Sequence, residues 1–225
     1  MTSDQELETM ELYGALISPY VRKTATVMDI KGLNYELIMV IPGSPPEGYA
    51  AISPLMKIPA LVDGNTKIAD STVICEYLED QYPTIATKPS LPADRAKSRW
   101  LEEYADTNVS EAAAGIFFER LVKPALMNQP ADEARVTHLI DELLPPVQDY
   151  LETQLPEKDF LFGSLGSADI SIATMFINAQ YGGYQIDQQR WPKLQAFIER
   201  VKTHPVVANI LSKEQEILAM LTTNN

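Results

Sequence analysis

Short apolar runs, separated by turn-forming residues, dominate the first third of the chain. Two of them, 10–16 (MELYGAL) and 34–41 (NYELIMVI), predict strands, and the second is dense enough in branched residues to predict a buried one. Between them, Ser18-Pro19 indicates a helix start, because serine is a good N-cap and proline fits the first helical position. Gly32 is the expected end of that helix.

A second pattern follows the loop 42–48, whose PGSPPEG sequence has too many breakers for regular structure. Short strands are predicted at 60–63 and 66–68, joined by a hairpin turn at Asp63-Gly64. Asp70-Ser71 then begins another helix. The order is strand–helix–strand followed by strand–strand–helix, which predicts one α/β layer of about 75 residues.

The remainder of the chain has apolar residues at helical spacing and no comparable strand pattern. We therefore expect a disordered lead at 1–9, an α/β domain at 10–83, a proline-rich linker at 84–92 and an all-helical domain at 93–225. The first long helix of that domain is expected to end at Pro124. A later one shows helical spacing despite two consecutive prolines at 145 and 146.

Composition narrows the possible partners. The 225 residues include 18 basic and 31 acidic side chains, a net charge of −13, so nucleic acid and anionic membranes are poor candidate partners. With one cysteine, Cys75, and two histidines, no zinc-ligand spacing exists and no metal is expected. No signal peptide or apolar span is apparent either. These features predict a soluble, cytoplasmic protein in which Cys75 is a buried apolar side chain.

Four stretches in a fixed order resemble one family. They are SPYVRK at 18–23, SPLMKIPAL at 53–61, ADSTVICEYL at 69–78 and GSADISIATMF at 166–176. Together they resemble the glutathione transferase superfamily over nearly the whole chain. The resemblance implies a thioredoxin-like, glutathione-binding first domain, an all-α second domain, glutathione as co-substrate and a homodimer.

The resemblance implies a serine-type transferase in which Ser18 activates the thiol. A hydroxyl donor near the sulfur, at the positive end of a helix, would lower the pKa of the thiol of bound glutathione. That matters because the thiolate is the nucleophile. Two alternatives remain: Ser18 serves only as a helix cap, or the hydroxyl of Tyr20 takes its place.

Five further residues are implied to bind glutathione: Lys57, Ile58, Pro59, Asp70 and Ser71. In this fold the Ile58-Pro59 peptide is cis, and the backbone of Ile58 would pair with the cysteinyl residue like an added strand. Ser71 would hold the γ-glutamyl carboxylate and Asp70 the ammonium, at a helix start that favours anions. Lys57 could meet the glycyl carboxylate. The alternatives are an ordinary trans proline, a simple capping pair and an exposed lysine.

Two positions depart from the family pattern. Met56 stands where relatives often have glycine, and its side chain could crowd the glycyl end of glutathione. Gly166 stands where relatives have serine or threonine, and glycine is the weaker helix cap. Asp169, three residues later, is expected to be structural.

Tyr104, Asn108 and Phe118 of the long helix are candidates for the second-substrate pocket. The predicted function is transfer of the glutathione thiolate to an electrophilic small molecule, as in detoxification, or reduction of a peroxide. The alternative is a regulatory or scaffolding protein with the same fold, like the stringent starvation proteins that bind RNA polymerase. A maleylacetoacetate isomerase is disfavoured because its Ser-Ser-Cys run is absent around Ser18.

Overall fold

The computed structural model describes residues 9–41 and 43–223, so most of the predicted disordered lead lies outside the described residues. The chain divides into two compact units between Ile85 and Ala86. This division falls inside the segment expected to be a linker, and each unit is described separately below.

The first unit contains the predicted α/β elements. In order they are β1 (Met10–Tyr13), α1 (Pro19–Ile30), β2 (Tyr35–Ile38), β3 (Ala60–Asp63), β4 (Thr66–Ala69) and α2 (Ser71–Gln81). Gly32 follows α1 with a φ of +67°, and its neighbour Leu33 donates its N–H to the carbonyl of Met28. The helix therefore ends at the glycine as predicted, because glycine adopts the left-handed conformation without a steric penalty.

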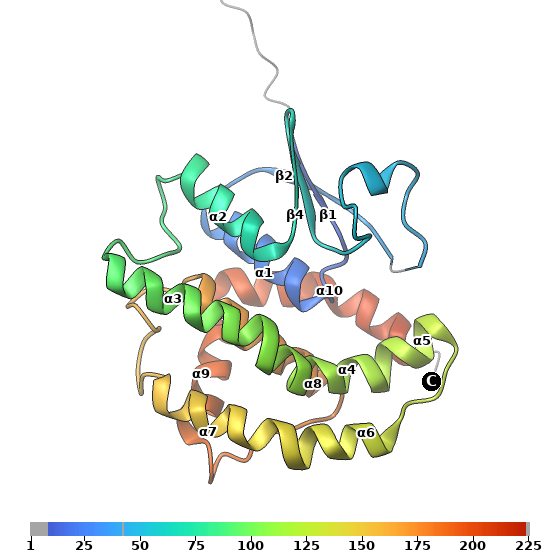
Figure 1. Ribbon diagram of the computed structural model, residues 1–225, viewed down its shortest axis with the longest axis vertical. Helices are drawn as coiled ribbons and strands as arrows, with labels where there is room; N and C mark the ends of the chain where they lie inside the picture. The colour runs from blue at the N-terminus through green and yellow to red at the C-terminus, as the bar shows by residue number, and fades with distance from the viewer. Residues whose placement is uncertain (1–8, 42, 224–225) are drawn as a thin grey trace, which may run out of the picture. The chain divides into compact units, whose positions relative to one another are not determined.

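The four strands form one mixed sheet in the order β2-β1-β3-β4. β1 pairs in parallel with β2, whereas β3 is antiparallel to both β1 and β4. Figure 1 shows α1 and α2 on one face of this sheet and the segment around Tyr49–Ala51 on the other. Val40, Tyr49 and Ala60 form the buried cluster that joins this segment to the sheet.

The prediction of a buried strand over 34–41 is wrong in part. Only Tyr35–Ile38 forms β2, and it lies at the edge of the sheet with its side chains partly or fully exposed. Met39 and Ile41 are each 47% exposed. Apolar density does not distinguish a central strand from an edge strand, because the order of strands is set by tertiary pairing.

The second unit is helical among its described residues. Its α-helices are α3 (Pro92–Tyr104), α4 (Gly115–Phe117), α5 (Lys123–Met127), α6 (Glu133–His138), α7 (Leu144–Gln154), α8 (Ser167–Tyr181), α9 (Pro192–Thr203) and α10 (Pro205–Thr223). α8 is buried almost along its whole length and packs against α3, α4 and α9. It is the central helix of this unit.

Pro124 does not end the long helix, contrary to the prediction. Helical structure runs from α3 to α5 through wider π-helical turns at 105–114 and 118–122, and it ends after Met127, where Asn128 has a φ of +51°. A proline lacks the N–H that a regular turn requires, but it is tolerated where the hydrogen-bond register changes. The prolines at 145 and 146 also follow a π-helical turn, 139–143.

Candidate functional site

One end of the sheet brings together three segments that are far apart in the sequence. The strand register pairs Tyr13 with Ala60 and Ala60 with Ala69, so the chain just beyond these residues meets at one edge. The backbone N–H of Asp70 donates to the carbonyl of Pro59 at 3.4 Å. Ile58-Pro59, which precede β3, therefore lie next to Asp70-Ser71, which follow β4, and β1 ends at the same end of the sheet.

Gly14 allows the chain to turn directly from β1 towards α1. Its φ is +153°, and a Cβ at this position would lie 2.5 Å from a methyl carbon of Val21. Any larger residue would separate the strand from the helix. Ser18 is thereby held at the start of α1, five residues beyond the end of the strand.

Ser18 occupies the N-cap position, but its hydroxyl makes no capping hydrogen bond. Its backbone N–H donates to Ala15 and its carbonyl accepts from Arg22. The side chain is partly exposed. Ser18 therefore occupies the cap position of α1 without using its hydroxyl for capping. Tyr20 lies two residues further along the chain and is also partly exposed.

The Ile58-Pro59 peptide is cis, as predicted. Ile58 is partly buried against the Tyr49 cluster, while Lys57 is exposed. The carbonyl of Lys57 accepts hydrogen bonds from the hydroxyls of Tyr49 and Ser53, both at 2.8 Å. These two bonds fix the backbone of the loop just before Ile58 and leave the Lys57 ammonium in solvent.

Met56 adopts a φ of +55°, a left-handed conformation that favours glycine. Its side chain is 47% exposed. Methionine therefore replaces glycine here at the cost of an unfavourable backbone conformation. Its side chain extends largely into solvent.

Asp70 is both a helix cap and a strained residue. Its Oδ1 accepts the backbone N–H groups of Thr72 at 2.9 Å and Val73 at 3.1 Å, so the capping interpretation is correct for this oxygen. Its φ of +89° is rare for a non-glycine residue, and such strain costs on the order of 1–3 kcal/mol and concentrates at functional sites. Ser71, the first residue of α2, is only 4% exposed.

Tyr104, Asn108 and Phe118 have different surroundings in the helical unit. Tyr104 is partly buried, with its ring 4.6 Å from that of Tyr150 and 6.1 Å from that of Trp100. Burial raises the pKa of the Tyr104 hydroxyl, which stays protonated at neutral pH. Asn108 is exposed and accepts from Thr107, and Phe118 is 40% exposed.

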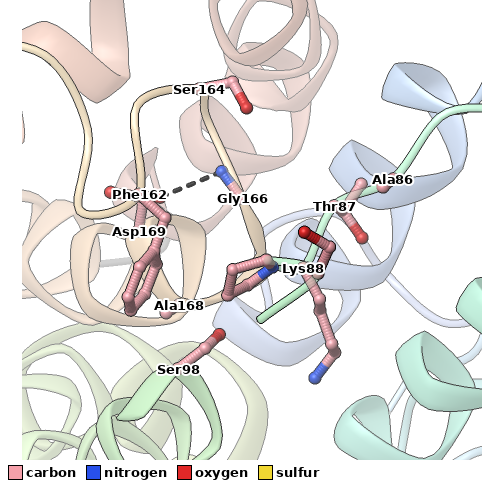
Figure 2. A pocket seen from close by; sticks show the side chains of 11 residues that line it. Ala86, Thr87, Lys88, Ser98, Phe162, Ser164, Gly166, Ala168 and Asp169 are labelled. Atoms are coloured by element: carbon pink, nitrogen blue, oxygen red, sulfur yellow. Dashed lines mark hydrogen bonds between the residues drawn. The ribbon is translucent and has the colours of Figure 1, made fainter. Parts of the chain in front are cut away.

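A cavity of about 230 Å³ lies in the helical unit, between the segment 86–90, Ser98 of α3, the start of α8 and the loop preceding α8. Its wall includes Thr87, Lys88, Ser98, Phe162 and Asp169, and Figure 2 shows the hydrogen bond that closes one side of it, from the Gly166 N–H to the Asp169 carboxylate. The sequence did not indicate this cavity.

Asp169 is structural in its contacts, as expected. One carboxylate oxygen accepts the N–H of Leu161 at 2.8 Å and the other that of Gly166 at 2.9 Å. Burial raises the pKa of Asp169 to about 6 although both hydrogen bonds oppose the shift. Gly166 is more than a weak cap, since a Cβ there would lie 2.7 Å from the carbonyl oxygen of Thr87.

The single cysteine and the described helices add no further candidate for chemistry or for membrane insertion. Cys75 is fully buried, as predicted, and within the described ranges no three histidine, cysteine or acidic side chains form a group that could hold a metal ion. Among the described helices, none combines the length and the apolar character that crossing a bilayer would require.

Comparison with known proteins agrees with this geometry. The family model of the glutathione S-transferase N-terminal domain matches residues 12–89, and that of the C-terminal domain matches residues 117–214. The chain is 32% identical to glutathione S-transferase 3 of Zea mays over 68% of its own length and 70% of the relative. It is 27% identical to glutathione S-transferase U8 of Arabidopsis thaliana, over 98% of this chain and 96% of that one.

The fold has a close structural counterpart. A glutathione S-transferase from Rhodospirillum rubrum F11 superposes with a TM-score of 0.82 at 24% identity, covering 91% of this chain and 92% of the other. The predicted architecture, a thioredoxin-like domain followed by an all-α domain, is therefore confirmed. The chain belongs to the glutathione S-transferase superfamily.

Proposed function

We propose that this protein is a serine-type glutathione transferase that uses the sheet edge between Ser18 and Ser71 to bind glutathione. The main support is the position of Ser18, which caps α1 without using its hydroxyl for capping. It lies at the same end of the sheet as the cis Ile58-Pro59 peptide and Asp70-Ser71. Family membership and the curated relatives, which are glutathione S-transferases, support the same activity.

In this proposal Ser18 donates its hydroxyl hydrogen to the sulfur of glutathione. A hydrogen bond to the charged form, together with the positive end of α1, lowers the pKa of the thiol and raises the thiolate fraction at neutral pH. The thiolate forms a bond to an electrophilic carbon, and the leaving group departs with its electron pair. With a peroxide, the thiolate attacks one oxygen, the O–O bond breaks, and the alkoxide leaves and takes up a proton to become an alcohol. The sulfenic acid formed on the sulfur then reacts with a second glutathione to give the disulfide and water.

The two ends of glutathione would be held by different groups. Ser71, the first residue of α2, suits the γ-glutamyl carboxylate, because a helix start attracts anions. Asp70 offers Oδ2 to the ammonium, since both capping hydrogen bonds go to Oδ1. The backbone of Ile58 would pair with the cysteinyl residue. The exposed ammonium of Lys57 can reach a glycyl carboxylate in solvent.

Tyr104, Asn108 and Phe118 remain our candidates for the wall that contacts the second substrate. The exposed fraction of Phe118 and the aromatic cluster at Tyr104 are consistent with a hydrophobic electrophile. We further propose a homodimer in the cytoplasm with a role in detoxification. The dimer is expected from the family, and light scattering of the purified protein would test it.

The decisive experiment is a glutathione titration by calorimetry, followed by thiolate absorbance of the complex as a function of pH. We expect saturable binding that Ser71→Ala weakens. Ser18→Ala should raise the pKa of the bound thiol and leave affinity nearly unchanged, whereas Tyr20→Phe, the matched control, should leave that pKa in place. A larger effect from Tyr20→Phe would assign thiol activation to Tyr20.

The same titration separates the enzyme from the scaffold alternative. A protein of the stringent starvation type would keep the fold but lack a working glutathione site. No binding at millimolar glutathione would reject the transferase proposal and favour that alternative. The four candidate side chains at the sheet edge, Ser18, Lys57, Asp70 and Ser71, favour the enzyme.

A further inference from the structure

Two buried hydroxyl groups hold one backbone carbonyl just before the cis peptide. The hydroxyls of Tyr49 and Ser53 both donate to the carbonyl oxygen of Lys57, each at 2.8 Å. The two side chains that carry them are 1% and 0% exposed, respectively. Burial raises the pKa of the Tyr49 hydroxyl, so this group stays protonated and remains a donor at neutral pH. Neither side chain is among the groups proposed above to contact glutathione.

These hydroxyls belong to a loop that is closed by its own hydrogen bonds and attached to the sheet. The N–H of Ser53 donates to the carbonyl of Tyr49, and that of Met56 to the carbonyl of Ser53, both at 2.9 Å. The Tyr49 side chain lies in the buried cluster that includes Ala60, the first residue of β3. Its ring centroid is 5.8 Å from that of Tyr13, the last residue of β1. The loop is therefore fixed to the ends of both strands that border the proposed site.

The fixed carbonyl of Lys57 also sets the direction of the next N–H group. The Lys57-Ile58 peptide is trans, because the one cis peptide among the described residues is the bond that follows it. In a trans peptide the C=O and N–H groups point in opposite directions. The N–H of Ile58 therefore points away from the two buried hydroxyls. It donates no hydrogen bond within the part of the chain that the structure describes, so it is available to a ligand.

We infer that Tyr49 and Ser53 are positioning residues for glutathione: by holding the Lys57 carbonyl, they direct the N–H of Ile58 at the cysteinyl carbonyl of the ligand. This inference rests on the proposed glutathione site. Strand-like pairing with a ligand gains affinity when the protein backbone is already oriented, because a peptide that must first be ordered costs free energy on binding. The two hydroxyls themselves do not contact the reacting sulfur.

Three ligands, each titrated into the full chain by calorimetry, separate this contact from the other parts of glutathione. Glutathione offers both the cysteinyl carbonyl and the glycyl carboxylate. γ-Glutamylcysteine ethyl ester keeps that carbonyl and lacks the glycyl carboxylate, so the proposed contact with the Lys57 ammonium is removed. γ-Glutamylcysteamine keeps the γ-glutamyl group and the thiol but lacks the cysteinyl carbonyl, so it cannot accept the hydrogen bond from Ile58.

The variants are Tyr49→Phe, Ser53→Ala and the double variant, which remove hydroxyl groups and change the size of the side chains little. Tyr35→Phe is the matched control. The hydroxyl of Tyr35, on β2, also donates within the first unit, but to Asp29 of α1 at 3.0 Å rather than to the loop. Circular dichroism verifies the fold of each variant before titration.

We expect each single variant to weaken glutathione binding on the order of twofold, because the remaining hydroxyl still holds the carbonyl. The double variant should weaken it on the order of tenfold. This exceeds the product of the two single effects, since two donors on one acceptor are coupled. The ethyl ester should lose affinity by the same factors, whereas binding of γ-glutamylcysteamine should stay unchanged. Tyr35→Phe should bind all three ligands as the unchanged protein does.

Three results would overturn this role while leaving the glutathione site in place. Unchanged affinity of the double variant for glutathione would show that the hydroxyls serve only the fold. Equal losses for all three ligands would indicate a general distortion of the site, and a loss for glutathione without one for the ester would assign the effect to the glycyl end. If the unchanged protein binds no glutathione, the proposed function itself fails and the inference with it. If the double variant does not fold, the two single variants decide by the same comparison of ligands.

Discussion

At the scale of single residues, two residues with positive φ flank the proposed glutathione site, and they differ in the contacts that hold them. Asp70, at φ +89°, is fixed by its two capping hydrogen bonds and by the bond from its N–H to Pro59. Met56, at φ +55°, has a largely exposed side chain. The backbone strain at Asp70 is therefore part of the proposed site. The strain at Met56 is local, and a substitution can relieve it.

Met56→Gly should consequently stabilise the protein. Relief of the left-handed conformation gains about 1–2 kcal/mol, and the greater chain freedom of glycine in the unfolded state offsets about 0.4–1 kcal/mol. A net gain of about 0.5–1 kcal/mol should raise Tm by about 2 °C in a chain of this size. Thermal unfolding followed by circular dichroism measures it. Met56→Ala is the control and should give no comparable gain; an equal gain would show that side-chain removal alone is responsible.

Gly166→Ala should have the opposite effect. The added Cβ would lie 2.7 Å from the backbone oxygen of Thr87, which cannot move away as a flexible side chain could. It would also disturb the hydrogen bond from the Ser167 N–H to the same oxygen. We expect a loss of about 1–3 kcal/mol in the free energy of unfolding, measured by urea titration. Ser164→Ala, at an exposed neighbouring position, should stay within about 0.5 kcal/mol of the unchanged protein.

At the scale of secondary-structure elements, α8 depends on its N-terminal contacts. The helix is buried almost along its whole length, and its first turn is tied to the preceding loop by Asp169 and to the segment before α3 by the bond from Ser167 to Thr87. The Ser167 hydroxyl also donates to Glu102 of α3, which is paired with the buried Lys88 at 2.8 Å. Polar groups thus position the central helix of an otherwise apolar unit.

The raised pKa of Asp169 predicts a specific pH dependence. The unfolded chain loses this proton near pH 3.8, whereas the folded protein holds it to about pH 6. The contribution of Asp169 to the free energy of unfolding should therefore fall as pH rises from about 4 to about 6, and stay constant above that. Other carboxyls titrate in the same range, so the quantity to measure is the difference between the unchanged protein and Asp169→Asn.

Urea unfolding of both proteins at intervals from pH 4 to pH 7 provides this difference. The stability of the unchanged protein relative to Asp169→Asn should decline through the interval and then level off. A difference that increases towards pH 6 would indicate that the two backbone hydrogen bonds outweigh burial, and that the pKa of Asp169 is lowered.

At the scale of the whole molecule, the chain has a net charge of −13, yet its proposed ligand is an anion. In our proposal the attraction comes from local groups, namely the start of α2 and Lys57, rather than from the overall field. Local groups in a negatively charged protein favour a ligand whose carboxylates match their positions.

Glutathione should stabilise the folded protein in proportion to its affinity. A ligand at 100 times its Kd adds about 2.7 kcal/mol to the free energy of unfolding, which raises Tm by several degrees. Thermal scans with increasing glutathione should show this rise, reduced in Ser71→Ala. Cysteinylglycine at equal concentration is the control. A Tm that does not change with glutathione would argue against binding at the sheet edge.

The sequence by itself determined several ends of elements and the candidates for the site. Ser18-Pro19, Gly32 and Asp70-Ser71 mark helix ends through local chemistry, and the Asp63-Gly64 turn defines a hairpin, so each could be read from a few neighbouring residues. The residues implied to bind glutathione followed from a resemblance carried by short motifs. These are properties of adjacent positions.

Tertiary structure decided what depends on distant segments. It placed β2 at the edge of the sheet, carried the long helix past Pro124, and brought Thr87 so close to Gly166 that only glycine fits. It also buried Lys23 against Thr72. Each of these features depends either on a contact with a residue distant in the sequence or on a change of hydrogen-bond register within a helix. The spacing of apolar residues encodes neither, because it reports the period of an element and not its surroundings.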